Sequence, residues 1–134
     1  MTLPLAGLRV LAVEQYGAGP FGTQFLADQG AEVIKIENPN DGGDFARAVG
    51  PHFFTPEHSQ FFHAYNRNKK SFAINLRTEE GQRIFHELLK TTDVVYESGV
   101  PAARKKLRAD YESCKATKPD IIYASFPGFG LGSP

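Results

Sequence analysis

The stretch from Leu8 to Gly30 constrains the fold more than any other part of the sequence. It opens with an apolar run that ends at Val13, of the kind that forms a buried parallel strand. Two glycines then allow a tight turn, and Pro20 suits the first turn of a helix, where its missing N–H has no intrahelical partner. Apolar residues recur at helical spacing as far as Gly30, a typical helix stop. The stretch therefore predicts a strand, a glycine-rich turn and a helix.

The glycine-rich turn is a candidate phosphate site. Gly17, Gly19 and Gly22 match the G-x-G-x-x-G pattern of dinucleotide-binding domains. A helix that starts in such a turn presents free N–H groups and the positive end of its dipole, and both favour a phosphate. A second apolar run ends in Glu37, where such domains place the acid that binds the ribose. The pattern leaves two interpretations open: a nucleotide-type cofactor site, or a tight structural turn without a ligand.

The rest of the chain alternates strand patterns with helix patterns. Further strands are predicted at 33–37, 72–76, 93–97 and 121–124, and further helices at 59–65, 78–90, 101–108 and 111–118. A polar turn is predicted at 66–71, and 45–58 is expected to be irregular with a short helix. The alternation predicts an α/β fold, in which helices cover both faces of a parallel sheet. Because 126–134 form a glycine-rich loop after the last strand, we expect this chain to be the front part of a longer protein.

Charge and cysteine content limit the function classes. The 15 basic and 15 acidic side chains cancel, so net charge gives no argument for binding nucleic acid or a membrane surface. The single cysteine, Cys114, excludes an internal disulfide and a cysteine-based metal cluster, and it fits a reducing compartment such as the cytoplasm. No apolar run approaches the length of a membrane span. A length of 134 residues predicts one soluble domain.

Five stretches together carry a family resemblance. They are PLAGLRVLAVE from Pro4, GAGPFGTQFLADQGAEVIKIENP from Gly17, NRNKKSFAINLRTEEG from Asn66, DVVYESGVP from Asp93 and KPDIIYASFPGFGLGSP from Lys118. In order and spacing they resemble the class III coenzyme A transferases, the group of the formyl-CoA and carnitine-CoA transferases. The alpha-methylacyl-CoA racemases belong to the same superfamily. Each motif alone is weak, but the five in register cover nearly the whole chain.

The resemblance implies that residues 1–134 are the Rossmann-like N-terminal domain of a longer chain that binds coenzyme A (CoA) and forms an interlocked homodimer. It implies transfer of CoA between an acyl-CoA and a carboxylic acid, through an aspartyl mixed anhydride and an enzyme–CoA thioester. The catalytic aspartate is expected beyond 134, so we expect no catalytic residue in this chain and no activity from it alone. Acyl-CoA racemisation stays open as an alternative. From other classes, an NAD-dependent oxidoreductase domain and a non-catalytic binding module also stay open.

Position by position, the resemblance implies CoA contacts in the glycine turn, in the segments after three strands and in a basic run at 104–108, which reads RKKLR. These residues are Gly17, Ala18, Asn38, Ile74, Asn75, Leu76, Arg77, Ser98, Gly99, Val100 and Lys106. Asn38 and Ser98 replace residues that are commonly Arg and Asn in the family. Lys106 stands where Arg is frequent, and a lysine lacks the bidentate fork of arginine. The expected partners are acyl-CoA, a carboxylic acid and a second copy of the chain, with no metal, nucleic acid or membrane.

Overall fold

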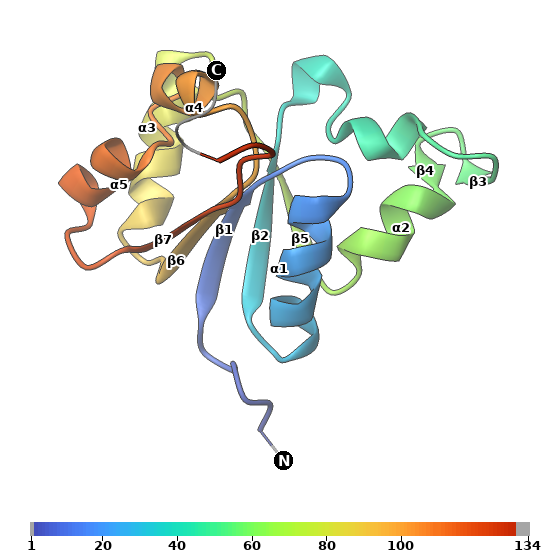
Figure 1. Cartoon of the computed structure of the whole chain (residues 1–134), viewed down its shortest axis with the longest axis horizontal. Coiled ribbons are helices and arrows are strands. Elements are labelled where there is room, and N and C mark those ends of the chain that lie inside the picture. The colour runs from blue at the N-terminus through green and yellow to red at the C-terminus, as the bar shows by residue number, and fades with distance from the viewer. Residues whose placement is uncertain (1, 131–134) are drawn as a thin grey trace.

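The computed structural model describes residues 2–130, and its centre is a sheet of five parallel strands (Figure 1). Its strands are β1 Arg9–Val13, β2 Glu32–Glu37, β5 Lys70–Ala73, β6 Val94–Glu97 and β7 Ile122–Ser125. They lie in the order β5-β2-β1-β6-β7. Counted along the chain within this sheet, the order is 3-2-1-4-5, which is that of a Rossmann-like fold. The predicted fold class is therefore confirmed.

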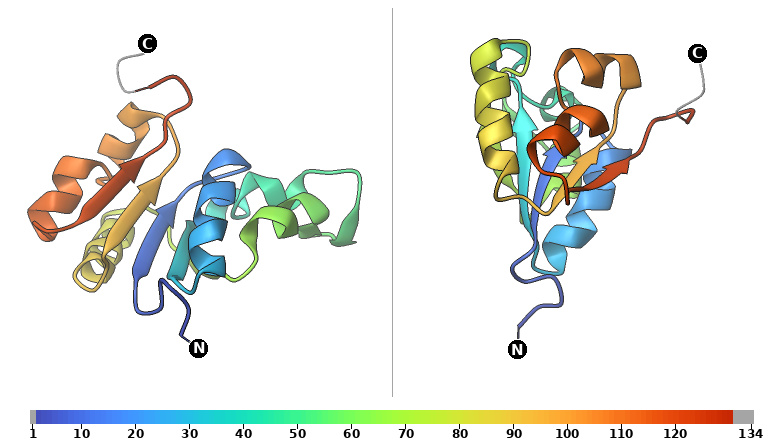
Figure 2. Two further views of the ribbon diagram at one scale, coloured as in Figure 1. Left: turned by 60° about the horizontal axis from the view of Figure 1, so that its bottom comes forward. Right: turned by 90° about the vertical axis from the view of Figure 1, so that its left-hand side faces the viewer.

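Helices cover both faces of the sheet, as the right-hand view of Figure 2 shows. The helices are α1 Ala18–Asp28, α2 Gln60–Asn66, α3 Glu79–Leu89, α4 Pro101–Lys106 and α5 Tyr111–Thr117. Successive side chains of a strand point to opposite faces, so β1 contributes to two cores. Val10 packs with Ala27 of α1 in one core, whereas Leu11 packs with Phe85 of α3 in the other. Within residues 2–130, no helix is both long enough and apolar enough to cross a bilayer.

The first helix begins and ends where the sequence predicts. Gly17 is its N-cap residue. At the other end, the amide of Gly30 donates to the carbonyl of Ala27 at 3.0 Å, and that of Ala31 donates to the carbonyl of Leu26 at 3.1 Å. These are the two hydrogen bonds of a Schellman motif, and the φ angle of 99° at Gly30 is one that favours glycine. The motif returns the chain directly into β2.

Two predictions about the middle of the chain are wrong in their boundaries. The strand expected at 72–76 is Lys70–Ala73, so the polar turn expected at 66–71 is partly strand and partly the end of α2. Ile74 and Leu76 follow this strand, and both side chains are buried in the core beneath α3. The alternation of apolar residues here reflects a loop that packs into the core.

The segment expected to be irregular with a short helix contains more regular structure. A 3₁₀ turn at Phe45–Ala48 is followed by an antiparallel pair of strands, β3 Phe53–Thr55 and β4 His58–Ser59. The hydroxyl of Ser59 then caps α2 by accepting a hydrogen bond of 3.0 Å from the amide of Phe62. The helix predicted at 59–65 is thereby confirmed, and the short pair of strands is what the sequence analysis missed.

Candidate functional site: a cavity at the carboxyl edge of the sheet

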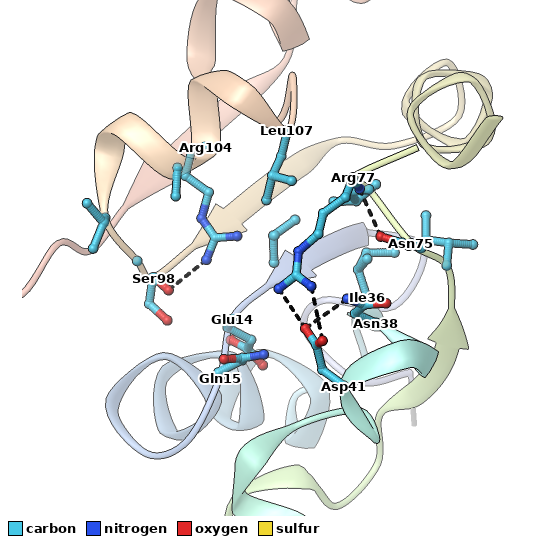
Figure 3. Close-up of a pocket in the computed structure, with 16 residues that line it drawn as sticks. Glu14, Gln15, Ile36, Asn38, Asp41, Asn75, Arg77, Ser98, Arg104 and Leu107 are labelled. Carbon is cyan, nitrogen blue, oxygen red and sulfur yellow. Dashed lines mark hydrogen bonds and ion pairs between the residues drawn. The ribbon is translucent and has the colours of Figure 1, made fainter. Parts of the chain in front are cut away.

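A cavity of about 360 Å³ lies at the carboxyl ends of the strands (Figure 3). From β1 the chain continues to β2, toward one edge of the sheet, whereas from β6 it continues to β7, toward the opposite edge. The strand order therefore reverses between the neighbouring strands β1 and β6, which flank a topological switch point. Ligands of open α/β sheets bind outside the carboxyl ends of the strands at such a point. The volume of the cavity is within the range of small-molecule sites. Position and size therefore make it the candidate ligand site.

Most of the predicted CoA contacts meet in this cavity, although they come from distant parts of the sequence. The loops after β2, β5 and β6 bring them together (Figure 3). Eight of the eleven residues line it, namely Asn38, Ile74, Asn75, Leu76, Arg77, Ser98, Gly99 and Val100. Their convergence follows from the parallel sheet, which places the carboxyl ends of its strands along one edge.

The other three predicted contacts lie outside the lining of this cavity. Gly17 and Ala18 are at the start of α1, and Gly17, the N-cap residue, has no side chain that could cap the first amides of that helix. Lys106 is the last residue of α4 and is exposed. Its backbone carbonyl accepts a hydrogen bond of 3.4 Å from the side-chain amide of Gln82. The roles of all eleven residues as CoA contacts stay predictions.

An ion pair extends across the cavity between two of its loops (Figure 3). Arg77 donates from its two terminal nitrogens to the two carboxylate oxygens of Asp41, at 3.0 and 2.8 Å. The side-chain amide of Asn38 donates to the same carboxylate at 2.8 Å. The backbone amide of Arg77 also donates to the side chain of Asn75 at 2.9 Å. The loops after β2 and β5 are thus joined by charged and amide groups at the site.

A second arginine orders the loop after β6. Arg104 of α4 donates to the carboxylate of Glu97 at 3.1 Å and to the carbonyl of Ser98 at 2.9 Å. Glu97 is only 2% exposed, and its other oxygen accepts a hydrogen bond from the hydroxyl of Ser125. Arg104 belongs to the basic run in which the sequence analysis selected Lys106. The structure brings Arg104 to the cavity and leaves Lys106 in solvent.

Glu37 does not offer the free carboxylate that the dinucleotide interpretation requires. It is 5% exposed and accepts four hydrogen bonds: two from Arg47, one from the hydroxyl of Ser71 and one from the amide of Asp44. A carboxylate has about four acceptor positions, so none is left for a ribose hydroxyl. Burial alone raises the pKa of Glu37, but the hydrogen bonds outweigh burial and hold the pKa at about 2. Glu37 is therefore a structural residue that stays ionised.

A buried ionic network beside the cavity was missed by the sequence analysis. The ammonium of Lys35 lies 2.7 Å from the Asp44 carboxylate and 3.6 Å from that of Glu14, and all three side chains are 0–1% exposed. Lys69 and Thr23 donate to Glu14 at 2.9 and 2.8 Å. Burial lowers the pKa of Lys69 to about 8, although the charge of Glu14 opposes this. The available signal was a lysine inside the apolar run of β2.

Comparison with known proteins shows which family this chain belongs to. The family model described as CoA-transferase family III matches residues 5–134. This chain belongs to CoA-transferase family III. It is 42% identical over 136 residues to a succinate–glutarate CoA-transferase of Agrobacterium fabrum, and 44% identical over 131 residues to a succinyl-CoA:glutarate CoA-transferase of Mus musculus.

The likeness to these family members covers almost all of this chain but only part of theirs. Each alignment covers 98% of this chain, against 34% of the Agrobacterium protein and 30% of the mouse protein. The crystal structure of a CAIB/BAIF family protein from Brucella suis superposes with a TM-score of 0.90 at 41% identity, covering 100% of this chain and 36% of that one. The chain thus spans about a third of the length of the family members it matches.

Proposed function

We propose that this chain forms the CoA-binding domain of a class III CoA-transferase, which moves CoA between an acyl-CoA and a carboxylic acid. One observation carries the proposal. In a chain of this family, eight residues to which the resemblance assigns CoA contacts line one cavity at the switch point of the sheet. Sites of this kind in open α/β sheets bind ligands that carry phosphates and a nucleoside.

The chemistry of the cavity fits the parts of CoA. Ile36, Leu76 and Leu107 give it an apolar wall, which suits a pantetheine arm or an adenine ring. Arg77 lies on the same cavity with its side chain 65% exposed, and a guanidinium binds phosphate through a bidentate pair of hydrogen bonds. The site therefore combines apolar surface with a solvent-accessible cation, as a nucleotide thioester requires.

The proposed reaction passes through an aspartyl mixed anhydride and an enzyme–CoA thioester, with the aspartate supplied from outside residues 1–134. The names of the related proteins make short dicarboxylic acids the first acceptors to test. We further propose that the active protein is a homodimer, as the family resemblance implies, and that it is cytoplasmic, because a single cysteine fits a reducing compartment.

Calorimetric titration of the 134-residue chain with CoA and with NAD tests the proposed domain function. We expect CoA to bind and NAD to bind far more weakly, because Glu37 has no acceptor free for a nicotinamide nucleotide's ribose. Binding of NAD as tight as that of CoA, or no binding of CoA at all, would falsify the proposal.

A further inference from the structure

In the contact between Arg77 and Asp41, the aspartate carboxylate is held by the kinds of donor that would bind an anionic ligand. The carboxylate of Asp41 receives two hydrogen bonds from the guanidinium of Arg77 and one from the amide of Asn38. All three residues line the candidate CoA cavity, and Figure 3 shows the arginine side chain extending across it to the aspartate. The same donors, a planar guanidinium fork and an amide, are those that bind a phosphate group. Asp41 thus occupies the place that an anionic ligand would take.

The ion pair between Arg77 and Asp41 is one that another anion can replace. The side chains of Arg77 and Asp41 are 65% and 38% exposed, and exposed ion pairs are weak because water competes for both partners. Asp41 ends a 3₁₀ turn, Pro39–Asp41, and is followed by two glycines with φ angles of 75° and 85°. Arg77 lies between β5 and α3, in a segment without regular structure. Either side chain can therefore move without disrupting a helix or strand.

We propose that Asp41 is an internal competitor for the phosphate-binding side chains of the cavity, and that a phosphate group of CoA displaces it from Arg77 and Asn38. In the ligand-free protein, the aspartate neutralises the guanidinium and joins the loops after β2 and β5. On binding, the phosphate takes over the hydrogen bonds from Arg77 and Asn38, and the carboxylate turns to solvent. Asp41 thereby sets the affinity for CoA without contacting it. This inference rests on the proposed function.

The first test is the isosteric substitution Asp41→Asn, measured by calorimetric titration of CoA at low salt. Removing the competing charge leaves Arg77 free, so we expect the dissociation constant for CoA to fall threefold to tenfold. The control Glu112→Gln removes the same charge at the exposed first turn of α5, and it should leave the dissociation constant unchanged. An unchanged or higher dissociation constant for Asp41→Asn, with the melting temperature retained, overturns the inference.

A double-variant cycle shows whether Asp41 acts through Arg77. Arg77→Ala alone should weaken CoA binding, and adding Asp41→Asn to it should bring no gain, because no guanidinium is left to release. An equal gain from Asp41→Asn in both backgrounds contradicts the inference, since it reports a general charge effect. Failure of the unsubstituted chain to bind CoA contradicts instead the proposed function, so the two failures are distinguishable.

Truncated ligands identify the phosphate. CoA has a diphosphate bridge and a ribose 3′-phosphate, whereas dephospho-CoA lacks the 3′-phosphate and pantetheine lacks both groups. A gain from Asp41→Asn that persists with dephospho-CoA supports exchange with the diphosphate, and a gain that disappears supports exchange with the 3′-phosphate. A gain that persists with pantetheine overturns the inference, because that ligand has no phosphate to compete with the carboxylate.

Discussion

Gly19 of α1 lies so close to Ser98 that a β-carbon at position 19 would come within 2.1 Å of the Ser98 hydroxyl oxygen. It would also lie 2.8 Å from the β-carbon of Ser98 and 3.0 Å from that of Glu14. Glu14 follows β1 and Ser98 follows β6, so this contact packs the first turn of α1 against the switch point. Close packing against Ser98 and Glu14 therefore explains why position 19, the second glycine of the G-x-G-x-x-G pattern, is a glycine.

We predict that Gly19→Ala destabilises the protein by about 1–2 kcal/mol. Alanine is favoured over glycine in helices by up to about 1 kcal/mol, but overpacking costs about 1–3 kcal/mol and dominates here. Because Ser98 lines the cavity, CoA binding should weaken as well. Urea denaturation measures the change in the free energy of unfolding. Gly128→Ala is the matched control, because a β-carbon there meets nothing within 4 Å.

Glu37 should make the stability of the protein sensitive to acid. Its folded-state pKa of about 2 lies below the ordinary 4.5, so its contribution is complete above the unfolded-state pKa and is lost as the pH falls from 4.5 toward 2. A difference of this size corresponds to about 3 kcal/mol at most. We predict that Glu37→Gln lowers the free energy of unfolding at pH 7 and flattens its pH dependence between pH 5 and pH 2.

Urea denaturation at a series of pH values checks the role of Glu37. Glu112→Gln is the control, because Glu112 is exposed and its removal should leave the acid slope unchanged. Parallel pH profiles for the unsubstituted protein and Glu37→Gln would contradict the prediction, since they would assign the acid sensitivity to other carboxylates.

The sequence predicts the sheet well because the relevant signals are local. Buried strands are continuous apolar runs, and helix ends carry their own markers, such as Thr78, whose hydroxyl accepts a hydrogen bond of 3.1 Å from the amide of Gly81 at the start of α3. The third strand is misplaced because all four residues of Lys70–Ala73 are exposed at the sheet edge, so no apolar periodicity marks it. Its register is set by pairing with β2, and local sequence does not report that pairing.

The candidate site, like the fold, could be predicted from the sequence only in part. Family motifs locate the loops that line the cavity, including the loop after the misplaced strand β5. Motifs do not report which charged groups pair inside the fold. Lys69 and Glu14 are 55 positions apart, and the contact between them depends on the packing of α2 against α1, which brings the segment after α2 to the start of α1. For the same reason, the pairing of Arg77 with Asp41 and the saturation of Glu37 are visible only in three dimensions.

The buried network gives a large stability prediction. Lys35→Met removes the cation that lies 2.7 Å from Asp44, and leaves that carboxylate buried without a charged partner at this distance. Breaking a buried pair in this way costs about 3–5 kcal/mol. The control Lys70→Met removes a cation that is 69% exposed on the neighbouring edge strand, and should change stability by well under 1 kcal/mol. Similar losses for the two variants in thermal or urea unfolding would refute a special role for the network.

The last prediction concerns Lys106, which the structure leaves exposed at the end of α4. A lysine at the rim contributes by charge attraction to a phosphate, and in water this is worth about 1 kcal/mol and weakens with salt. We therefore predict that Lys106→Ala raises the dissociation constant for CoA about fivefold at low salt, and that it affects dephospho-CoA much less. Lys105→Ala is the matched control, since it removes a neighbouring charge that is also exposed. Equal losses for the two lysines, or for the two ligands, would show that Lys106 is a solvent-exposed lysine without a phosphate contact, and would leave Arg77 as the cation that binds phosphate.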